Sequence, residues 1–205
     1  WLLLNAVPGY LAWRKAKKVA RRRVDAAPRV ERRGYDVLDV GARRTSAAEK
    51  LAAEQEKLSD FIYDKINNGV YKAGFTTRQR VYARACRELF DALDRLEERL
   101  ARSRYLFGMR IVETDWRLFC TLIRFDVVYY IHFKCSLRRI LDYHNLQGYL
   151  IDLYQHEGIA ETVNFDHIKR HYYMTHGAIN PSRIVPIGPI LDLTREHGRA
   201  RLDAG

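Results

Sequence analysis

Apolar side chains recur with helical spacing along most of the chain, and this pattern predicts a helical protein. Ser46 and Glu49 have the S-x-x-E spacing of a capping box, so we expect the first helix to begin at Ser46. Asn67, Asn68 and Gly69 are expected to end this helix. Its apolar face would consist of Leu51, Leu58, Phe61, Ile62 and Ile66.

A second amphipathic segment follows, with Thr77 as its expected N-cap. Acidic residues and arginines occupy the side opposite its apolar positions, which predicts a long helix with one buried face. The apolar positions are Val81, Tyr82, Ala85, Leu89, Leu93, Leu96 and Leu100.

Residues 165–189 predict a short helix followed by an irregular strap. His167 and His171 are one helical turn apart and would share a face. No third ligand stands at a suitable spacing, so neither a metal nor any other cofactor is predicted. The strap cannot continue the helix because it contains Pro181, Pro186 and Pro189.

Composition indicates one ordinary folded core and a strongly basic start. The chain has 205 residues, of which 47% are hydrophobic and 30% are charged. Most of the net charge of +11 lies in residues 1–45, so the basic character belongs to an N-terminal arm.

The arm begins with the apolar run WLLLNAVPGYLAW, which is too short to cross a bilayer. Four interpretations remain open: a truncated membrane span, an interfacial segment, an organellar targeting region, and an unstructured arm on an acidic partner. Nucleic acid is less favoured, because no aromatic residues interleave the arginines. The candidate contact residues are Trp1, Tyr10, Trp13, Arg14, Lys15, Lys17, Lys18, Arg21, Arg22 and Arg23.

The cysteines, Cys86, Cys120 and Cys135, stand far apart and form no C-x-x-C pair. This spacing argues for a reducing compartment and against a disulfide framework or a zinc ribbon. We expect each thiol to be a buried structural group.

Several long segments carry a family resemblance. They include FIYDKINNGVYKAGF, LEERLARSRYLFG, the run from Trp116 to Tyr173, and the strap. Together, from Leu58 to Leu202, they resemble the C-terminal half of the glutathionyl-hydroquinone reductases, the xi class of glutathione transferases. The resemblance implies an all-α, glutathione transferase C-terminal-like helical bundle over residues 46–176. A basic arm would precede it at 1–45, and an irregular strap would follow at 177–205.

One departure from the family lies at the buried helix that begins near Val112. The family usually places Ser or Thr three residues before Asp115, and here that position is Val112. Thr114 could serve as the cap if the helix began two residues later.

The resemblance also implies an acceptor site. Tyr71 and Tyr172 match the tyrosines whose hydroxyls bind the hydroquinone, although a place as core or interface aromatics is the favoured interpretation of both. Tyr129, Tyr130, His132 and Lys134 follow the family pattern at the mouth of the same site, without a role that the sequence defines.

The catalytic half of the family is not found in the sequence. Neither its Cys-Pro-Trp-Ala motif nor a thioredoxin-like domain is recognisable. We therefore expect a pseudoenzyme, a noncatalytic accessory subunit of a larger protein complex held at a membrane, with the mitochondrion as its compartment. By family analogy a homodimer is possible. The alternatives are a glutathione-dependent reductase whose thioredoxin half is missing from this chain, and an RNA-associated subunit of an organellar ribosome.

Overall fold

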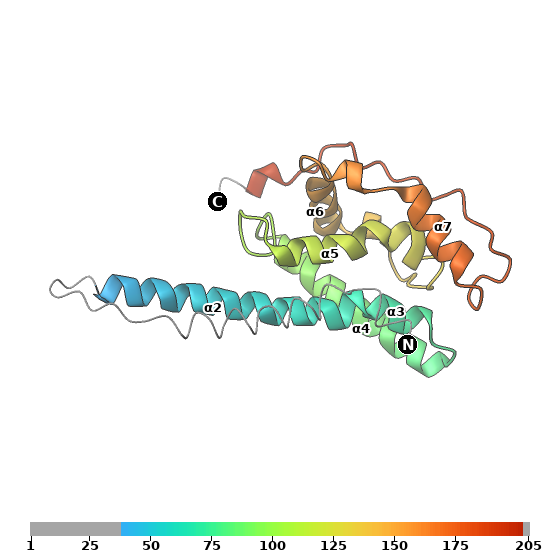
Figure 1. Cartoon of the computed structure of the whole chain (residues 1–205), viewed down its shortest axis with the longest axis horizontal. Coiled ribbons are helices and arrows are strands. Elements are labelled where there is room, and N and C mark those ends of the chain that lie inside the picture. Colours follow the sequence, from blue (N-terminus) through green and yellow to red (C-terminus); the bar gives the residue numbers. More distant parts are fainter. Residues whose placement is uncertain (1–37, 203–205) are drawn as a thin grey trace. The chain divides into compact units, whose positions relative to one another are not determined.

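The structure, a computed structural model, describes residues 38–202 (Figure 1). These residues form helices and connecting loops without a β-strand, so the predicted all-α class is confirmed. The α-helices are α2 (Leu38–Ile62), α3 (Gly69–Gly74), α4 (Gln79–Leu100), α5 (Glu113–Arg124), α6 (His144–Tyr154) and α7 (Phe165–Thr175). Two π-helical segments, η2 (Tyr63–Asn67) and η3 (Phe125–Tyr129), continue α2 and α5, and three short 3₁₀ turns are η4 (Ile140–Asp142), η5 (Ala160–Thr162) and η6 (Ala200–Leu202).

The chain divides into two units, Trp1–Ser46 and Ala47–Gly205, and the second contains the bundle. Helix α2 already begins at Leu38, so the predicted start at Ser46 is wrong. The residues after Ser46 are rich in Ala, Lys and Glu, which favour a helix, and the helix continues before Ser46 through residues 38–45. The boundaries of the arm and the strap stay predictions.

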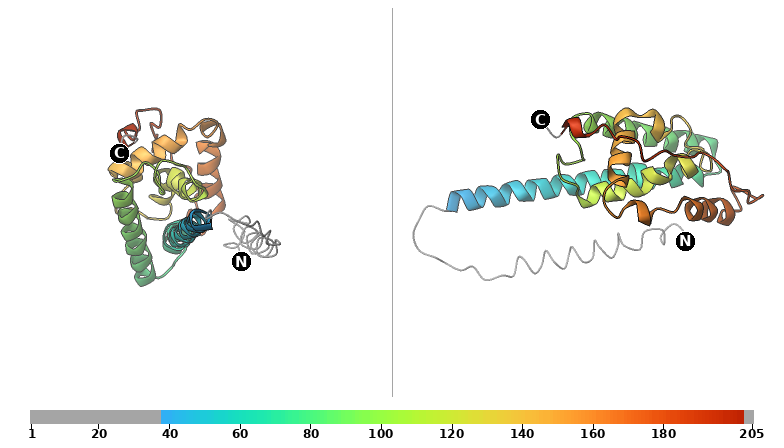
Figure 2. Two further views of the ribbon diagram at one scale, coloured as in Figure 1. Left: turned by 90° about the vertical axis from the view of Figure 1, so that its left-hand side faces the viewer. Right: turned by 90° about the horizontal axis from the view of Figure 1, so that it is seen from above.

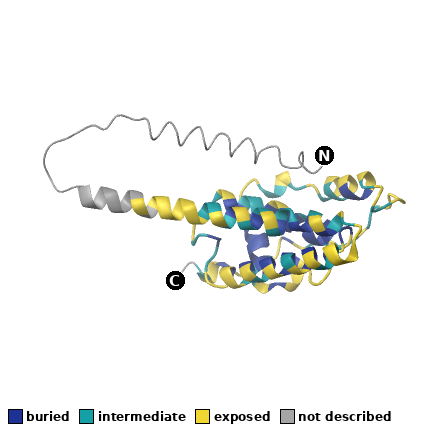
Figure 3. Cartoon of the chain, turned by 90° about the horizontal axis from the view of Figure 1, so that it is seen from below, coloured by how far each residue is buried: buried dark blue, intermediate teal, exposed yellow. Residues whose placement is uncertain are grey.

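Helix α4 supplies the largest share of the core, and α3, η2 and α6 pack against it. Its predicted face is buried at Leu89, Leu93, Leu96 and Leu100, whereas Val81 is 45% exposed. In Figure 3 the buried stretches of the ribbon gather within the bundle, and the yellow stretch of α2 is exposed.

Two local predictions about side chains were wrong. Helix α4 has Arg78 as its N-cap, with an extended backbone and no side-chain cap, so Thr77 does not cap it. Cys86 and Cys135 are buried as expected, but Cys120 on α5 is exposed.

Helix α5 begins without a side-chain cap at Val112, as the sequence indicated, and Thr114 does not replace it. Asp115 supplies the missing support: its carboxylate accepts the Val112 N–H at 2.8 Å and the Leu106 N–H at 3.0 Å. The Tyr149 hydroxyl donates to the same group at 2.8 Å, which links α5 to α6. Burial raises the pKa of Asp115, and these donors oppose the rise.

A second carboxylate caps a helix from a neighbouring one. Glu97, on α4, accepts the backbone N–H groups of Asn145 and Leu146, each at 2.7 Å. These are N–H groups of the first turn of α6, which have no partner within their own helix. Because the N-cap residue Tyr143 makes no side-chain cap, Glu97 satisfies this helix end.

The C-terminal strap runs from α7 back across α6 towards the end of α4 (Figure 2). Lys169 of α7 donates to the carbonyl of Ile187 at 2.6 Å, and Gln155 donates to the carbonyl of Leu193 at 2.8 Å. Arg199 is 2% exposed and donates to the carbonyls of Leu100 at 2.8 Å and Ser103 at 2.5 Å. The strap is therefore bonded to three helices.

Candidate functional site

Three tyrosine hydroxyls from three separate elements meet at one point. Tyr71 comes from α3, Tyr129 ends η3, and Tyr172 lies on α7. The Tyr172 oxygen is 2.7 Å from that of Tyr71 and 3.0 Å from that of Tyr129. The oxygens of Tyr71 and Tyr129 are 3.5 Å apart. We call these three residues the tyrosine cluster.

Aromatic rings enclose the tyrosine cluster on its apolar side. The Phe133 ring stacks on Tyr129 with a centroid distance of 5.4 Å and meets Tyr172 edge to face at 5.9 Å. Phe75 stacks in parallel on Tyr71 at 6.3 Å. Such walls suit a flat, apolar ring whose polar atoms face the hydroxyls.

The residues of the cluster differ in their exposure to solvent. Tyr129 and Tyr172 are only 2% and 7% exposed, whereas Tyr71 is half-buried and Phe75 is 41% exposed. Burial, followed by the neighbouring tyrosines, raises the pKa of Tyr129 well above its usual value. Burial likewise raises the pKa of Tyr172, so both are neutral phenols at physiological pH.

The hydroxyls leave one hydrogen-bond position to a ligand. Each phenol can donate one proton and can also accept. The contacts of Tyr172 are short, but the 3.5 Å between Tyr71 and Tyr129 is well beyond the usual O–H···O distance. An incoming oxygen can replace this weak contact and accept a proton from Tyr71 or Tyr129.

A histidine pair lies beside the cluster. His132 Nε2 is 3.1 Å from His176 Nδ1, which joins the segment after η3 to the end of α7. The His176 ring stacks on Phe133 and meets Tyr172 edge to face. Burial, followed by His176 and Lys134, lowers the pKa of His132 to about 4. Burial, followed by His171, also lowers the pKa of His176, so both rings are neutral near pH 7.

The structure brings together the two tyrosines that the sequence indicated and adds a hydroxyl partner. Tyr129 was placed at the site mouth without a role, and its hydroxyl is part of the cluster. Phe133 and His176 had no signal of their own, because their distance from Tyr71 along the chain hides the contact. Tyr130 is half-buried and Lys134 is exposed, and neither side chain reaches the three hydroxyls.

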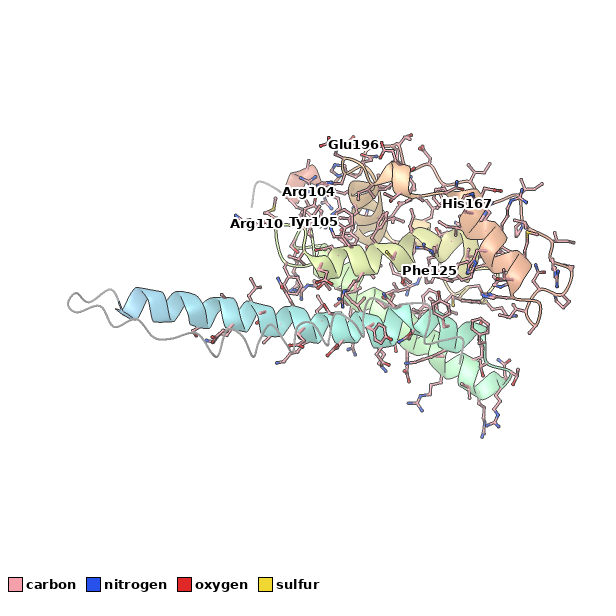
Figure 4. The ribbon with its side chains drawn as sticks, viewed as in Figure 1. Arg104, Tyr105, Arg110, Phe125, His167 and Glu196 are labelled. Carbon is pink, nitrogen blue, oxygen red and sulfur yellow. The ribbon has the colours of Figure 1, made fainter. Side chains whose placement is uncertain are left out.

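The other predicted features are the N-terminal contact residues and the histidines of α7. Trp1, Tyr10, Trp13 and the basic residues from Arg14 to Arg23 lie outside the described residues. His167 is exposed on α7 (Figure 4), and His171 meets the rings of Tyr172 and His176. Within residues 38–202, no three His, Cys, Asp or Glu side chains are grouped so as to hold a metal ion. In the same range, no helix has the length and apolar character needed to cross a bilayer.

The fold and the site define a class of protein. Residues 79–151, from the start of α4 into α6, match the family described as "Glutathione S-transferase, C-terminal domain". The described bundle is therefore a helical domain of the glutathione S-transferase type.

The most informative similarities are to glutathionyl-hydroquinone reductases. Glutathionyl-hydroquinone reductase YqjG of Escherichia coli is 54% identical over 149 residues, which are 73% of this chain and 45% of the relative. Glutathionyl-hydroquinone reductase PcpF of Sphingobium chlorophenolicum is 49% identical over 136 residues, 66% of this chain and 44% of the relative. The glutathione-bound structure of YqjG aligns with a TM-score of 0.72 at 53% identity, over 74% of this chain and 50% of that one.

The chain is strongly homologous to these reductases but spans less than half the length of the curated relatives. The predictions of a pseudoenzyme and of a noncatalytic accessory subunit are wrong, because relatives at 49% and 54% identity are named as enzymes. This chain covers under half of the length of these relatives, so the absence of the Cys-Pro-Trp-Ala motif from it does not bear on the activity.

The predicted membrane complex and the alternative of a ribosomal subunit find no support either. The names of the relatives support neither a membrane complex nor a ribosomal subunit. The mitochondrial assignment came from the Arg-rich start, the reduced cysteines and the Ala/Arg-rich basic body of the chain, and the compartment stays a prediction that residues 38–202 do not test.

Proposed function

We propose that this chain forms the acceptor-binding helical part of a glutathionyl-hydroquinone reductase, with the tyrosine cluster holding the hydroquinone. The observation that carries the proposal is the meeting of three phenol hydroxyls within 3.5 Å, in a chain that is 54% identical over 149 residues to a reductase of that name. A hydroquinone combines a flat apolar ring with hydroxyl oxygens, which matches the aromatic walls and the open hydrogen-bond position.

The tyrosines would orient the hydroquinone rather than attack it. As neutral phenols, they donate to a hydroquinone oxygen and favour negative charge that develops on it while the bond between ring carbon and glutathione sulfur breaks. The thiol that takes up the glutathionyl sulfur and the site that holds glutathione would come from residues outside 38–202.

Hydroquinone itself is the probe for a first test. Titration of the purified chain, followed by calorimetry, should show saturable binding. Tyr172→Phe should weaken it about tenfold, because its hydroxyl contacts both other hydroxyls and a lost hydrogen bond of about 1 kcal/mol or more approaches that factor. Tyr130→Phe is the matched control and should leave the affinity unchanged. Equal affinities for Tyr172→Phe and the unsubstituted chain would refute the assignment.

The reaction is tested in a fusion that supplies the part of a relative that this chain does not match. A fusion that carries the unmatched N-terminal part of the Escherichia coli relative before this chain should reduce a glutathionyl-hydroquinone with glutathione as reductant. The same fusion with Tyr172→Phe should lose most of its kcat/KM. A folded fusion that binds glutathione but shows no turnover would contradict the proposed function.

We also propose a homodimer, since members of the glutathione transferase family are often homodimers and the chain shares their helical domain. Sedimentation velocity at micromolar concentration should give twice the chain mass of 24.1 kDa. A single monomeric species over the same range would exclude the dimer.

A further inference from the structure

The proposed function leaves one polar group beside the tyrosine cluster without a task, the imidazole of His176, which is the C-cap residue of α7. Its ring contacts both aromatic walls: it stacks on Phe133 with a centroid distance of 5.9 Å and meets Phe75 edge to face at 5.1 Å. It also meets the Tyr172 ring edge to face at 5.4 Å. A ligand that lies along these walls is therefore near the imidazole.

The two ring nitrogens of His176 have different surroundings. Nδ1 lies 3.1 Å from Nε2 of His132, a residue that is only 4% exposed. Since the two nitrogens of an imidazole lie on different edges of the ring, Nε2 of His176 faces away from His132. Among the residues that the structure describes, none forms a hydrogen bond or an ion pair with this Nε2. His176 thus has one nitrogen that is bonded within the protein and one that is free.

The free nitrogen of His176 suits a hydroxyl group of a ligand. Burial, followed by His171, lowers the pKa of His176, so its imidazole is neutral near pH 7. A neutral imidazole donates from one nitrogen and accepts at the other, and the tautomer decides which nitrogen does which. Because a hydroxyl both donates and accepts, Nε2 can form a hydrogen bond with it in either tautomer.

The imidazole stands apart from the point where the three tyrosine hydroxyls meet. Within residues 38–202, Tyr172 is the one member of the cluster whose ring contacts His176. A hydroquinone has its two hydroxyls at opposite ends of a flat ring. When one oxygen lies at the tyrosine hydroxyls, the other needs a partner elsewhere along the walls, and the His176 ring meets both of them.

We infer that His176 makes the tyrosine cluster specific for a ligand with two opposed hydroxyl groups, and that His132 is a positioning residue for His176. The inference rests on the proposed function, because it requires one ligand oxygen to lie at the tyrosine hydroxyls. Nε2 of His176 forms a hydrogen bond with the second hydroxyl. The bond between Nδ1 and His132 restricts the ring before the ligand arrives, which lowers the entropy cost of binding.

The expected discrimination between ligands is moderate. A site that forms a hydrogen bond with a ligand hydroxyl disfavours an analogue without that hydroxyl, since the polar group of the site is then left without a partner. His176 is half-buried, so water replaces part of the lost bond. A neutral hydrogen bond of this kind corresponds to about a tenfold difference in affinity.

Hydroquinone and phenol, which has a single hydroxyl, are the probes, and calorimetry on the full chain measures both affinities. The unsubstituted chain should bind hydroquinone about tenfold more tightly than phenol. His176→Phe keeps a ring against Phe133 but has no nitrogen, so its affinities for the two probes should lie within about twofold of each other. His176→Leu is a second variant with the same expected result. His132→Phe should reduce the preference for hydroquinone, whereas damage confined to the fold would weaken the binding of both probes by the same factor.

Two controls test whether the preference belongs to His176. His167→Gln changes an exposed histidine of α7, which is labelled in Figure 4, and should keep the preference for hydroquinone. Tyr172→Phe should weaken the binding of both probes together, since its hydroxyl serves the oxygen that they share. Equal affinities of the unsubstituted chain for the two probes, or an unchanged preference in both His176 variants, would overturn the inference and leave the proposed function standing. Binding of neither probe would refute the proposed function and the inference with it.

Discussion

At the scale of single residues, Gly74 leaves the space that the Phe133 ring of the tyrosine cluster's wall occupies. A Cβ atom at Gly74 would lie 2.2 Å from Cγ of Phe133 and 2.7 Å from its Cβ. Atoms do not approach so closely, so the Phe133 ring occupies space that any other residue at position 74 would fill. The ring that stacks on Tyr129 therefore depends on a missing side chain in α3.

Gly74→Ala should destabilise the protein and damage the cluster together. Alanine normally stabilises a helix relative to glycine by up to about 1 kcal/mol, but overpacking a core costs about 1–3 kcal/mol, so the clash should prevail. Urea unfolding should show a lower free energy of unfolding, and hydroquinone titration a lower affinity. Gly177→Ala, where nothing lies within 4 Å, is the control and should change neither. An unchanged affinity in Gly74→Ala would show that the ring is not needed.

His132 should make stability depend on pH. Burial lowers its pKa from 6.5 to about 4 in the folded protein, with His176 and Lys134 adding to the effect. Between pH 6.5 and about 4 the unfolded chain takes up a proton that the folded protein does not, so the free energy of unfolding falls as pH falls. Above pH 6.5 this contribution is fully present.

Urea unfolding at pH 4.5 and pH 7 measures this effect. His132→Gln should reduce the difference between the two values, since glutamine does not titrate. His167→Gln, at an exposed histidine of α7, should leave the difference as it is. The same pH difference in all three proteins would rule out His132 as its source.

The identities of single residues predicted two tyrosines of the site but not their contact. Tyr71 and Tyr172 were accessible through the family motifs, but they are 101 positions apart and only the fold shows that their hydroxyls touch. Cys120 illustrates the opposite case, because the general tendency of thiols to be buried does not identify which face of α5 points outward.

At the scale of elements, periodicity located the helices better than it located their ends. The buried side of α4 followed from the spacing of its leucines. The starts of α2 and α4 did not follow from Ser46 and Thr77, because caps add only about 0.5–2 kcal/mol and neighbouring contacts can outweigh them. The π-helical segments η2 and η3 have no sequence signature, yet η3 is what directs Tyr129 to the cluster.

The cap that α4 provides for α6 should be measurable at this scale. Glu97→Ala removes a carboxylate that accepts two backbone N–H groups at 2.7 Å. We expect a loss of about 2 kcal/mol in the free energy of unfolding, because bonds to charged acceptors contribute about 1.5–3 kcal/mol each and water recovers part of the loss. Glu98→Ala, its exposed neighbour, is the control and should stay within about 0.5 kcal/mol. A similar value for both variants would mean that α6 does not need the cap.

At the scale of the whole bundle, Arg199 connects the strap to the end of α4. Its guanidinium donates to the carbonyls of Leu100, Ser103 and Arg104, which lie at or just beyond the end of that helix. A cation there also opposes the partial negative charge of the helix terminus. Burial lowers the pKa of Arg199, but a guanidinium keeps its proton at physiological pH.

Arg199→Met should release the strap and weaken the bundle at once. The apolar side chain fills similar space but leaves buried carbonyls without donors, so we expect a loss of about 2–4 kcal/mol. Limited proteolysis should then cut the strap faster than in the unsubstituted chain. Arg201→Met removes an exposed arginine whose bonds are to Gly198 and His144, and its cleavage rate should stay near that of the parent. Equal cleavage rates in the two variants would contradict a role for Arg199 in holding the strap.

The bond from Arg199 to the carbonyl of Leu100 spans 99 positions. During synthesis, the end of α4 leaves the ribosome long before Arg199, whose guanidinium donates to its carbonyls, has been added to the chain. Until then the last carbonyls of α4 are hydrated, and the nascent bundle lacks the strap. A ribosome stalled shortly after residue 180 would therefore display a chain with α4 formed but its end still frayed, a state that chaperones could recognise.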